Sequence, residues 1–317
     1  MNQKLLAIVL DGIKVILKRE KRSLFYLGYY SILEAILLMV APLTSAFVIN
    51  SVIAHAKVSI ITLSVIVLVI FFGVAILQII KAYIIEKFEQ RIFVDNAIKI
   101  ALLSTASKKQ IDPQKLDKYM NYFFDVIAIQ KLLPSIVLNG VALAVKLFIS
   151  LLLLIVFDVS LFALGIFFIV SYLVLILWLG KRGPERAVAR SDAKHEAIHY
   201  LQTLPLHKQS TLLDKLDEFL YRYVKTRNSM FSVIIKQLSL TFIVEGLILS
   251  VFFIVGGYLV FKGNMAIGEF IAAEIIILTV TYALNDLMKQ IDYFYEIVEG
   301  FYKVHKLSHI LGEDANI

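Results

Sequence analysis

Six stretches of the chain are almost continuously apolar, and polar residues separate them. They cover residues 24–49, 59–82, 134–157, 159–180, 237–261 and 268–288. Each stretch is near or above the roughly 20 residues that a helix needs to cross about 30 Å of hydrocarbon. Lipid offers the backbone no hydrogen-bond partners, so such stretches must be helices or closed barrels. Because the runs are continuous rather than alternating, the pattern predicts an all-α membrane protein with six transmembrane helices.

The links between these stretches differ in length and in charge. The first, third and fifth links are short, whereas the second and fourth are long and polar. Most lysines and arginines lie in the two long links, and the three short links hold only Lys57 and Lys262. Basic residues collect on the cytoplasmic side of membrane proteins. The chain is therefore expected in the inner (cytoplasmic) membrane, with both long loops and both termini in the cytoplasm.

Helix-compatible sequence continues beyond the second and fourth apolar stretches. Residues 81–107 keep a helical pattern with no glycine or proline before Pro113, and residues 186–236 do the same with a break near Thr203 and Pro205. Proline is tolerated in the first turn of a helix, so a short transverse helix is expected to begin at each proline. The sequence thus predicts long helices that extend past the bilayer and reverse through short turns.

The N-terminal segment is too long and too charged for a cleaved signal peptide. Its apolar residues fall on one side of a helix and its basic residues fall mostly apart from them, as in Leu6, Val9, Ile13, Ile16 and Leu17 against Lys14, Lys18 and Arg19. This pattern is typical of an amphipathic helix on a membrane surface. The expected organisation is a cytoplasmic helix over residues 1–23, a six-helix domain over 24–300 and a cytoplasmic tail over 301–317.

Composition agrees with a membrane location. Hydrophobic residues make up 59% of the 317 residues, with a mean hydropathy of +0.81, whereas soluble domains are about 45–50% apolar. The absence of cysteine excludes disulfides, thiol nucleophiles and cysteine-ligated metals. The net charge of +7 is carried by the loops beside the membrane, so we expect no nucleic-acid partner.

Five charged residues lie inside the apolar stretches, where each is costly and usually faces a pathway or a partner. They are Glu34, Lys146, Glu245, Glu274 and Asp286. At about 1.5 Å per residue, Glu34 and Glu245 lie roughly 22–24 Å from the outer helix ends and Lys146 roughly 16 Å. These depths predict that Lys146 forms an ion pair with Glu34 or Glu245, and the alternative is that the charges face substrate.

One motif suggests metal chemistry. His195-Glu196-Ala-Ile-His199 places two imidazoles one helical turn apart with a glutamate that could serve as general base, as in zinc proteases. Glu218 is a candidate third ligand. The motif lies in a charged segment rather than an apolar one that would exclude water, so a membrane zinc protease is the weaker alternative and no metal site is assigned.

The layout resembles the transmembrane domain of ABC exporters of the haemolysin and peptide-secretion type. Gly263-Asn-Met-Ala-Ile-Gly268-Glu-Phe-Ile-Ala272 is similar to the G-x-L-T-x-G-x-L-I-A stretch that precedes the sixth span in that family. Gly300 to Leu311 resembles the linker to the nucleotide-binding domain, and Glu196 to Phe219 resembles the second cytoplasmic loop, with Thr203 where the family usually has glycine. The resemblance covers almost the whole chain through the order and spacing of these motifs.

The resemblance implies that the chain is a transport subunit without enzymatic activity of its own. Two short helices at the loop tips would couple it to an ATPase, through Asp112, Pro113, Lys115 and Leu116 in the first loop and Pro205, Leu206, His207 and Lys208 in the second. Two transmembrane domains form one pathway in the family, which implies a homodimer or heterodimer in membrane lipid. A periplasmic membrane-fusion protein is a further expected partner.

The chain departs from the family in one respect. It contains no G-x-x-x-x-G-K-[ST] phosphate loop and no Leu-Ser-Gly-Gly-Gln signature. No cofactor is therefore expected on this chain, and ATP would be bound by a separate subunit or by a longer form of the protein. Two alternatives stay open beside the protease: a proton-driven transporter of the same fold, with Glu34, Glu245, Glu274 and Asp286 as proton carriers, and a non-transporting assembly subunit.

Overall fold

The protein is a multi-pass membrane protein built almost entirely of helices. The computed structural model describes residues 3–53, 60–106, 121–204 and 212–311, and every element within these ranges is helical. The elements are α1 (Gln3–Arg19), α2 (Lys21–Leu38), α3 (Val40–Ile53), α4 (Ile60–Ala106), the 3-10 helix η1 (Asn121–Asp125), α6 (Val126–Phe157), α7 (Val159–Gly180), α8 (Gly183–Thr203), α9 (Leu212–Phe261) and α10 (Ile267–Leu311).

Six membrane-spanning segments are present, as the sequence predicts. The first is divided between α2 and α3, which separate at Met39. The cause is Pro42, whose ring nitrogen carries no hydrogen to donate to the carbonyl of Leu38 and whose ring crowds that carbonyl. The fourth, Val159–Thr203, includes both α7 and α8, which separate at Lys181 and Arg182, and its apolar part lies in α7. The other four segments each lie within one continuous helix. The six-span prediction is therefore confirmed, with a proline break in the first span.

Three helices extend far beyond the bilayer. Helices α4, α9 and α10 contain 47, 50 and 45 residues, which at 1.5 Å per residue makes each about 70 Å long. A hydrocarbon core is about 30 Å thick. The predicted continuation over 81–107 is confirmed up to Ala106, and the predicted break near Thr203 is confirmed by the end of α8. Helix α10 also passes through residue 300 without interruption.

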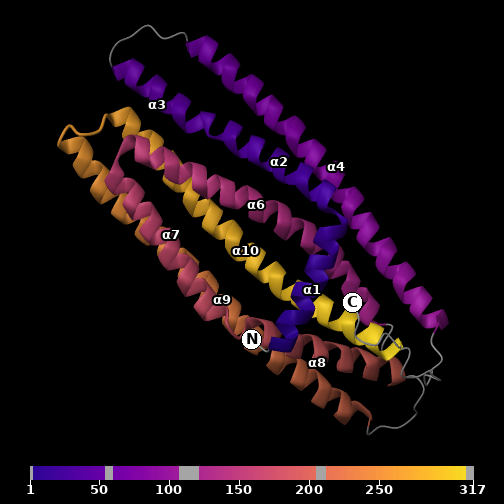
Figure 1. Ribbon diagram of the computed structural model, residues 1–317. Helices are drawn as coiled ribbons and strands as arrows, with labels where there is room; N and C mark the ends of the chain where they lie inside the picture. Colours follow the sequence, from indigo (N-terminus) through magenta and orange to yellow (C-terminus); the bar gives the residue numbers. More distant parts are fainter. Residues whose placement is uncertain (1–2, 54–59, 107–120, 205–211, 312–317) are drawn as a thin grey trace.

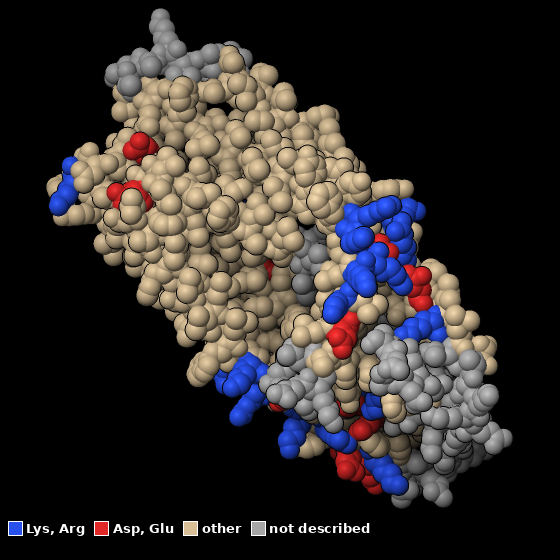
Figure 2. Space-filling view, viewed as in Figure 1, with Lys and Arg blue, Asp and Glu red and all other residues tan. Residues whose placement is uncertain are grey.

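Helices α6 and α10 run through the middle of the molecule, with α2, α3 and α4 on one side and α7 and α9 on the other (Figure 1). Helix α8 and the far ends of α4, α9 and α10 meet at one end. On the face in Figure 2, lysine and arginine gather over this end, and a broad region above it is nearly free of charge. The apolar region is typical of a surface that faces lipid, and the charged end is typical of a surface that faces water.

The main core lies between α6, α7, α9 and α10. Its buried members include large aliphatic and aromatic side chains such as Leu154, Tyr172, Ile248, Phe252 and Ile276. The hydroxyl of Tyr172 lies 3.0 Å from that of Thr241 on α9 and donates to the carbonyl of Leu284 on α10 at 3.2 Å. In lipid, where apolar contact alone gives little drive for helix association, such hydrogen bonds specify which helices pair.

The turn between α9 and α10 explains both glycines of the GNMAIG motif. Gly263 has a φ of 76°, and the amides of Gly263 and Asn264 close the end of α9 on the carbonyls of Val260 and Leu259 at 2.9 Å each. This Schellman cap requires a left-handed residue, which glycine adopts without steric cost. Gly268 instead permits close approach: its amide donates to the side chain of Asn50 on α3 at 2.9 Å.

Helix α1 differs from its predicted surroundings. The amphipathic helix is present, but its apolar side packs on protein rather than on lipid: Val9 is 2% exposed and lies in a cluster with Ile92 of α4 and Phe301 of α10. The hydrophobic pattern of α1 is equally compatible with a lipid surface and with a protein groove, so the sequence alone could not distinguish them.

Candidate functional site

A polar cavity of about 340 Å³, partly open to the surface on the side of the exposed Asp286 and Lys289, lies between α2, α4, α6 and α10. Its lining includes charged and amide side chains from all four helices: Glu34 from α2, Lys81 from α4, Asn139 and Lys146 from α6, and Asp286, Lys289 and Gln290 from α10. Charged groups among apolar spans are costly and mark functional positions. This cavity is therefore the candidate functional site of the membrane domain.

Helix periodicity places these side chains on common faces. On α10, Asp286, Lys289, Gln290 and Tyr293 all line the cavity, and their spacing of three, four and seven residues puts them on one side of the helix. On α2, the lining residues Ser31, Glu34 and Leu38 follow the same rule. The cavity therefore lies where these faces of α2 and α10 approach each other.

Glu34 is held by two donors from α4. Its side chain accepts a hydrogen bond from Gln78 Nε2 at 2.8 Å and forms an ion pair with Lys81. The residue as a whole is 9% exposed, so the carboxylate is largely removed from solvent. A buried carboxylate requires such a counter-charge and hydrogen bonds to remain ionised at acceptable cost.

The predicted ion pair between Lys146 and a glutamate is not formed. Lys81 takes the place expected for Lys146 at Glu34, and Glu245 on α9 accepts from Asn285 instead. Lys146 lines the same cavity as Glu34, yet it makes no hydrogen bond or ion pair within the described residues. Depth along the helix placed Lys146 and Glu34 together correctly, but depth could not reveal that α4 supplies a nearer lysine.

The other intramembrane charges divide between this cavity and separate positions. Asp286 lines the cavity and pairs with Lys289 at 3.0 Å, one turn along α10. Glu245 and Glu274 do not line it. Glu274 is half-buried on α10 and makes no hydrogen bond or ion pair within the ranges that the structure describes. Of the five predicted residues, the structure therefore brings together Glu34, Lys146 and Asp286.

A second polar site joins the helices outside the apolar region. Lys303 of α10 is completely buried, its ammonium pairs with Asp192 of α8, and it lies 4.5 Å from the centre of the Tyr122 ring in η1. Nearby, Arg190 of α8 donates to Glu299 of α10 at 2.6 Å. Ion pairs and cation–π contacts of this kind tie α8 and η1 to α10.

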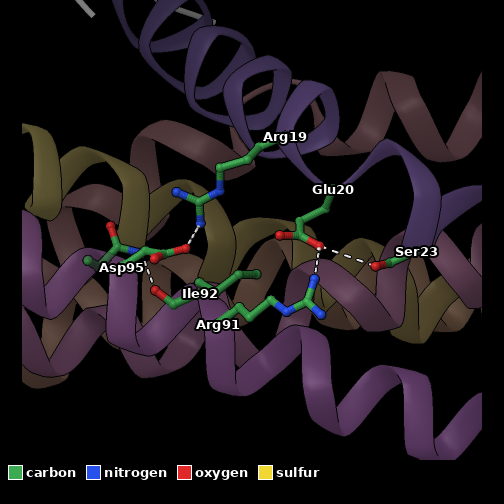
Figure 3. Close-up of polar contacts among 7 residues, drawn as sticks. Arg19, Glu20, Ser23, Arg91, Ile92 and Asp95 are labelled. Atoms are coloured by element: carbon green, nitrogen blue, oxygen red, sulfur yellow. Dashed lines mark hydrogen bonds and ion pairs between the residues drawn. The ribbon is translucent and has the colours of Figure 1, made fainter.

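A third polar cluster attaches the N-terminal helix to α4. Arg19 at the end of α1 pairs with Asp95, and Glu20 receives Arg91 at 3.2 Å and the hydroxyl of Ser23 at 3.2 Å (Figure 3). The residue Glu20 is 7% exposed. These contacts connect the short joint between α1 and α2 to the extension of α4.

The geometry around the His-Glu-x-x-His motif does not assemble a metal site. His195 is 4% exposed and packs edge-on against Tyr122, with ring centres 4.9 Å apart. Glu196 accepts from Arg222 of α9 at 2.8 Å, and Glu218 is exposed on α9. Within the described residues, no three histidine, aspartate or glutamate side chains gather closely enough to hold a metal ion. The zinc-protease alternative therefore finds no support in this part of the chain.

The predicted coupling residues lie outside the described residues. This applies to Asp112, Pro113, Lys115 and Leu116 and to Pro205, Leu206, His207 and Lys208. The described helix ends that flank them, Ala106 of α4 with Asn121 of η1 and Thr203 of α8 with Leu212 of α9, belong to the charged end of the molecule.

Several residues of the candidate site were not identified from the sequence. Lys81 falls at the end of the second apolar stretch, where a lysine is typical of the basic loop that follows. Lys289 and Gln290 lie just beyond the sixth stretch, although their helical spacing from Asp286 carried a usable signal. Ser31 gave none, because a serine in an apolar helix is common and says nothing about the face on which it lies.

The sequence matches no model of a known protein family, and it matches no curated protein at a significant level. The function must therefore be argued from the residues and their geometry.

Proposed function

We propose that the chain is the membrane-spanning subunit of an ABC-type exporter. In this proposal it lies in the inner membrane with both termini and both long loops in the cytoplasm. It pairs with a second transmembrane subunit, either another copy or a related chain, and is driven by a separate ATPase. Substrate would cross by alternating access, in which the pathway opens first to one side of the membrane and then to the other.

The observation that carries this proposal is the length and continuity of α4, α9 and α10. Each is about 70 Å long by its residue count, of which a bilayer needs only about 30 Å. The remaining 40 Å or so of each helix extends to the charged end of the molecule (Figures 1 and 2). Long continuous helices of this kind can transmit movement from a partner at the charged end to the part of the molecule that lies in the membrane.

Helix α10 connects the two ends of the proposed mechanism. It carries Asp286, Lys289 and Gln290 on the cavity wall and, about 20 Å further along, the buried Lys303 that joins it to α8. Movement of α8 by a bound ATPase would pass through the Lys303–Asp192 pair to α10. The same helix would then alter the cavity inside the membrane.

The ion pairs of Glu34 and Asp286 make these two carboxylates less suited to carry protons. A proton carrier must release its counter-ion when it takes up a proton. Glu34 is engaged by Lys81 and Gln78, and Asp286 by Lys289. A proton-driven transporter of the same fold is the second candidate. It would either break one of these pairs in each cycle or use Glu274, which has no hydrogen-bond or ion-pair partner in the described residues.

Purification from native membranes tests the proposal. We expect an ATPase subunit with a phosphate-binding loop to copurify in a fixed ratio. Lys208→Glu should weaken this association, because a reversed charge at a loop tip disturbs a docking surface. Lys262→Glu, an identical charge reversal at the opposite end of α9, should leave it intact. Copurification of no ATPase by the unmodified protein, or equal loss with both variants, would contradict the proposal.

A further inference from the structure

The polar cavity contains more positive than negative charge. Lys81 pairs with Glu34 and Lys289 pairs with Asp286, which leaves Lys146 without a carboxylate in the described residues. Lys146 lies about 16 Å along α6 from its outer end. At that depth an ammonium group is costly unless water or a counter-ion reaches it. The cavity therefore has the electrostatic character of an anion site.

Two further groups in the cavity wall are buried and lack partners. Ser31 is 1% exposed and Gln290 is 9% exposed. The hydroxyl of Ser31 and the side-chain carbonyl of Gln290 have no hydrogen-bond partner in the described part of the chain. Buried polar atoms are nearly always hydrogen-bonded. Both positions therefore suggest a ligand with polar groups beside Ser31 and Gln290. A serine hydroxyl can donate to an anion, and an amide carbonyl can accept from a hydroxyl beside that anion.

An apolar groove of about 680 Å³ lies further out between α3 and α4. It is lined by aliphatic, aromatic and small residues, among them Ala41, Val48, Val67 and Phe71. On α4, Val67 and Phe71 of the groove are followed by Gln78 and Lys81 beside the cavity, at intervals that keep one helical face. On the facing chain, the cavity ends at Leu38 and the groove begins at Ala41. The groove and the cavity therefore lie along one contact line, where α2 and α3 pack against α4.

We propose that this contact line binds an anionic phospholipid. The phosphate lies at Lys146 and Ser31 in the cavity, a headgroup hydroxyl donates to Gln290, and an acyl chain lies in the α3–α4 groove. A cation and polar partners at one end with an apolar groove at the other match the amphiphilic form of a lipid. This binding goes beyond the exporter role, because it can be measured with no ATPase present.

Lipid titration of the purified full-length protein in detergent tests the proposal. The probes are dioleoyl phosphatidylglycerol and dioleoyl phosphatidylcholine, which have identical chains and differ in headgroup, with bound lipid counted by native mass spectrometry. Both lipids carry the same phosphate, but the choline group adds a positive charge near Lys146 and has no hydroxyl to donate to Gln290, so we expect phosphatidylglycerol to bind more tightly by about tenfold or more. Lys146→Met removes the charge that repels choline and should reduce this preference, whereas Lys262→Met, which removes an exposed lysine from the α9–α10 turn, should keep it.

Two milder variants separate binding from folding. Ser31→Ala removes only a hydroxyl that has no partner, so it should fold normally and weaken phosphatidylglycerol binding several-fold. Val67→Trp fills the groove and should weaken the binding of both lipids. Equal affinity for the two lipids, or an unchanged preference in Lys146→Met and Ser31→Ala, would overturn the proposal. Displacement of phosphatidylglycerol by equimolar glycerol 3-phosphate would also overturn it, because the ligand would then be a soluble phosphate ester and the groove would contribute nothing.

Discussion

Replacement of Gly268 by alanine tests the contact between α3 and the start of α10, at the end of the bundle opposite the charged end. A methyl group on Gly268 would lie 2.2 Å from Asn50 Oδ1 and 2.7 Å from the backbone carbonyl oxygen of Ala46. The amide of Gly268 also donates to Asn50 at 2.9 Å, which satisfies one of the free amides at the start of α10. The asparagine side chain can move away, but the Ala46 carbonyl belongs to α3, so α3 and α10 must separate.

The expected cost follows from three contributions. Overpacking of a close contact costs about 1–3 kcal/mol, and loss of the hydrogen bond to Asn50 costs about 1 kcal/mol. Alanine returns up to about 1 kcal/mol, because it is the better helix former. Gly268→Ala should therefore lower the free energy of unfolding by about 1–4 kcal/mol and lower the thermal unfolding midpoint by several degrees.

Thermal unfolding in detergent, followed by circular dichroism, measures this effect. The matched control is Gly257→Ala in α9, where a methyl group meets nothing within 4 Å, so its midpoint should stay equal or rise. Asn50→Ala combined with Gly268→Ala should lose less than the sum of the two single variants, because both remove the same hydrogen bond. A Gly268→Ala midpoint at or above that of the control would refute the close approach of α3 and α10.

Two further predictions concern the part of the molecule outside the apolar spans. Lys303→Met should leave Asp192 with only the more distant Lys306 among the described residues. Because the Asp192 side chain is 33% exposed, the free energy of unfolding should fall by about 2 kcal/mol, less than for a fully buried pair. Lys306→Met, measured in the same unfolding assay, should have the smaller effect. An equal loss of unfolding free energy in both variants would show that the burial of Lys303 adds nothing to stability. Elemental analysis of the purified protein should find less than one zinc per chain, because Glu196 is occupied by Arg222; one zinc per chain that is lost in His199→Ala would contradict this reading.

The six spans and the long helical extensions could be predicted because each depends on local information. A run of some 20 apolar residues has one stable form in lipid, and a segment without glycine or proline continues as a helix. The start of α7 also depends on local information, because the side chain of Asp158 accepts a hydrogen bond from the amide of Ser160 at 2.7 Å and caps the helix. Signals of this kind can be read one helix at a time.

The partners of the charged residues could not be predicted, because they depend on how the helices rotate against one another. Depth placed Glu34 near Lys146, but the rotation of α4 that brings Lys81 to Glu34 leaves no mark in the sequence. The same limit applies to Lys303, which resembles a solvated lysine of a charged helix and is completely buried in the structure. For this reason, the sequence identified only some of the residues that line the candidate cavity.

Cross-linking from the two loop tips tests the proposed exporter role most directly. The chain has no cysteine, so Lys115→Cys, Lys208→Cys and Lys262→Cys each introduce a single reactive thiol. A short cysteine-to-amine cross-linker is applied in native membranes, and the adducts are identified by mass spectrometry. The proposal predicts that positions 115 and 208 both cross-link to a subunit with a phosphate-binding loop, and that position 262 does not. Adducts with no ATPase from either tip, or the same ATPase adduct from position 262, would contradict it.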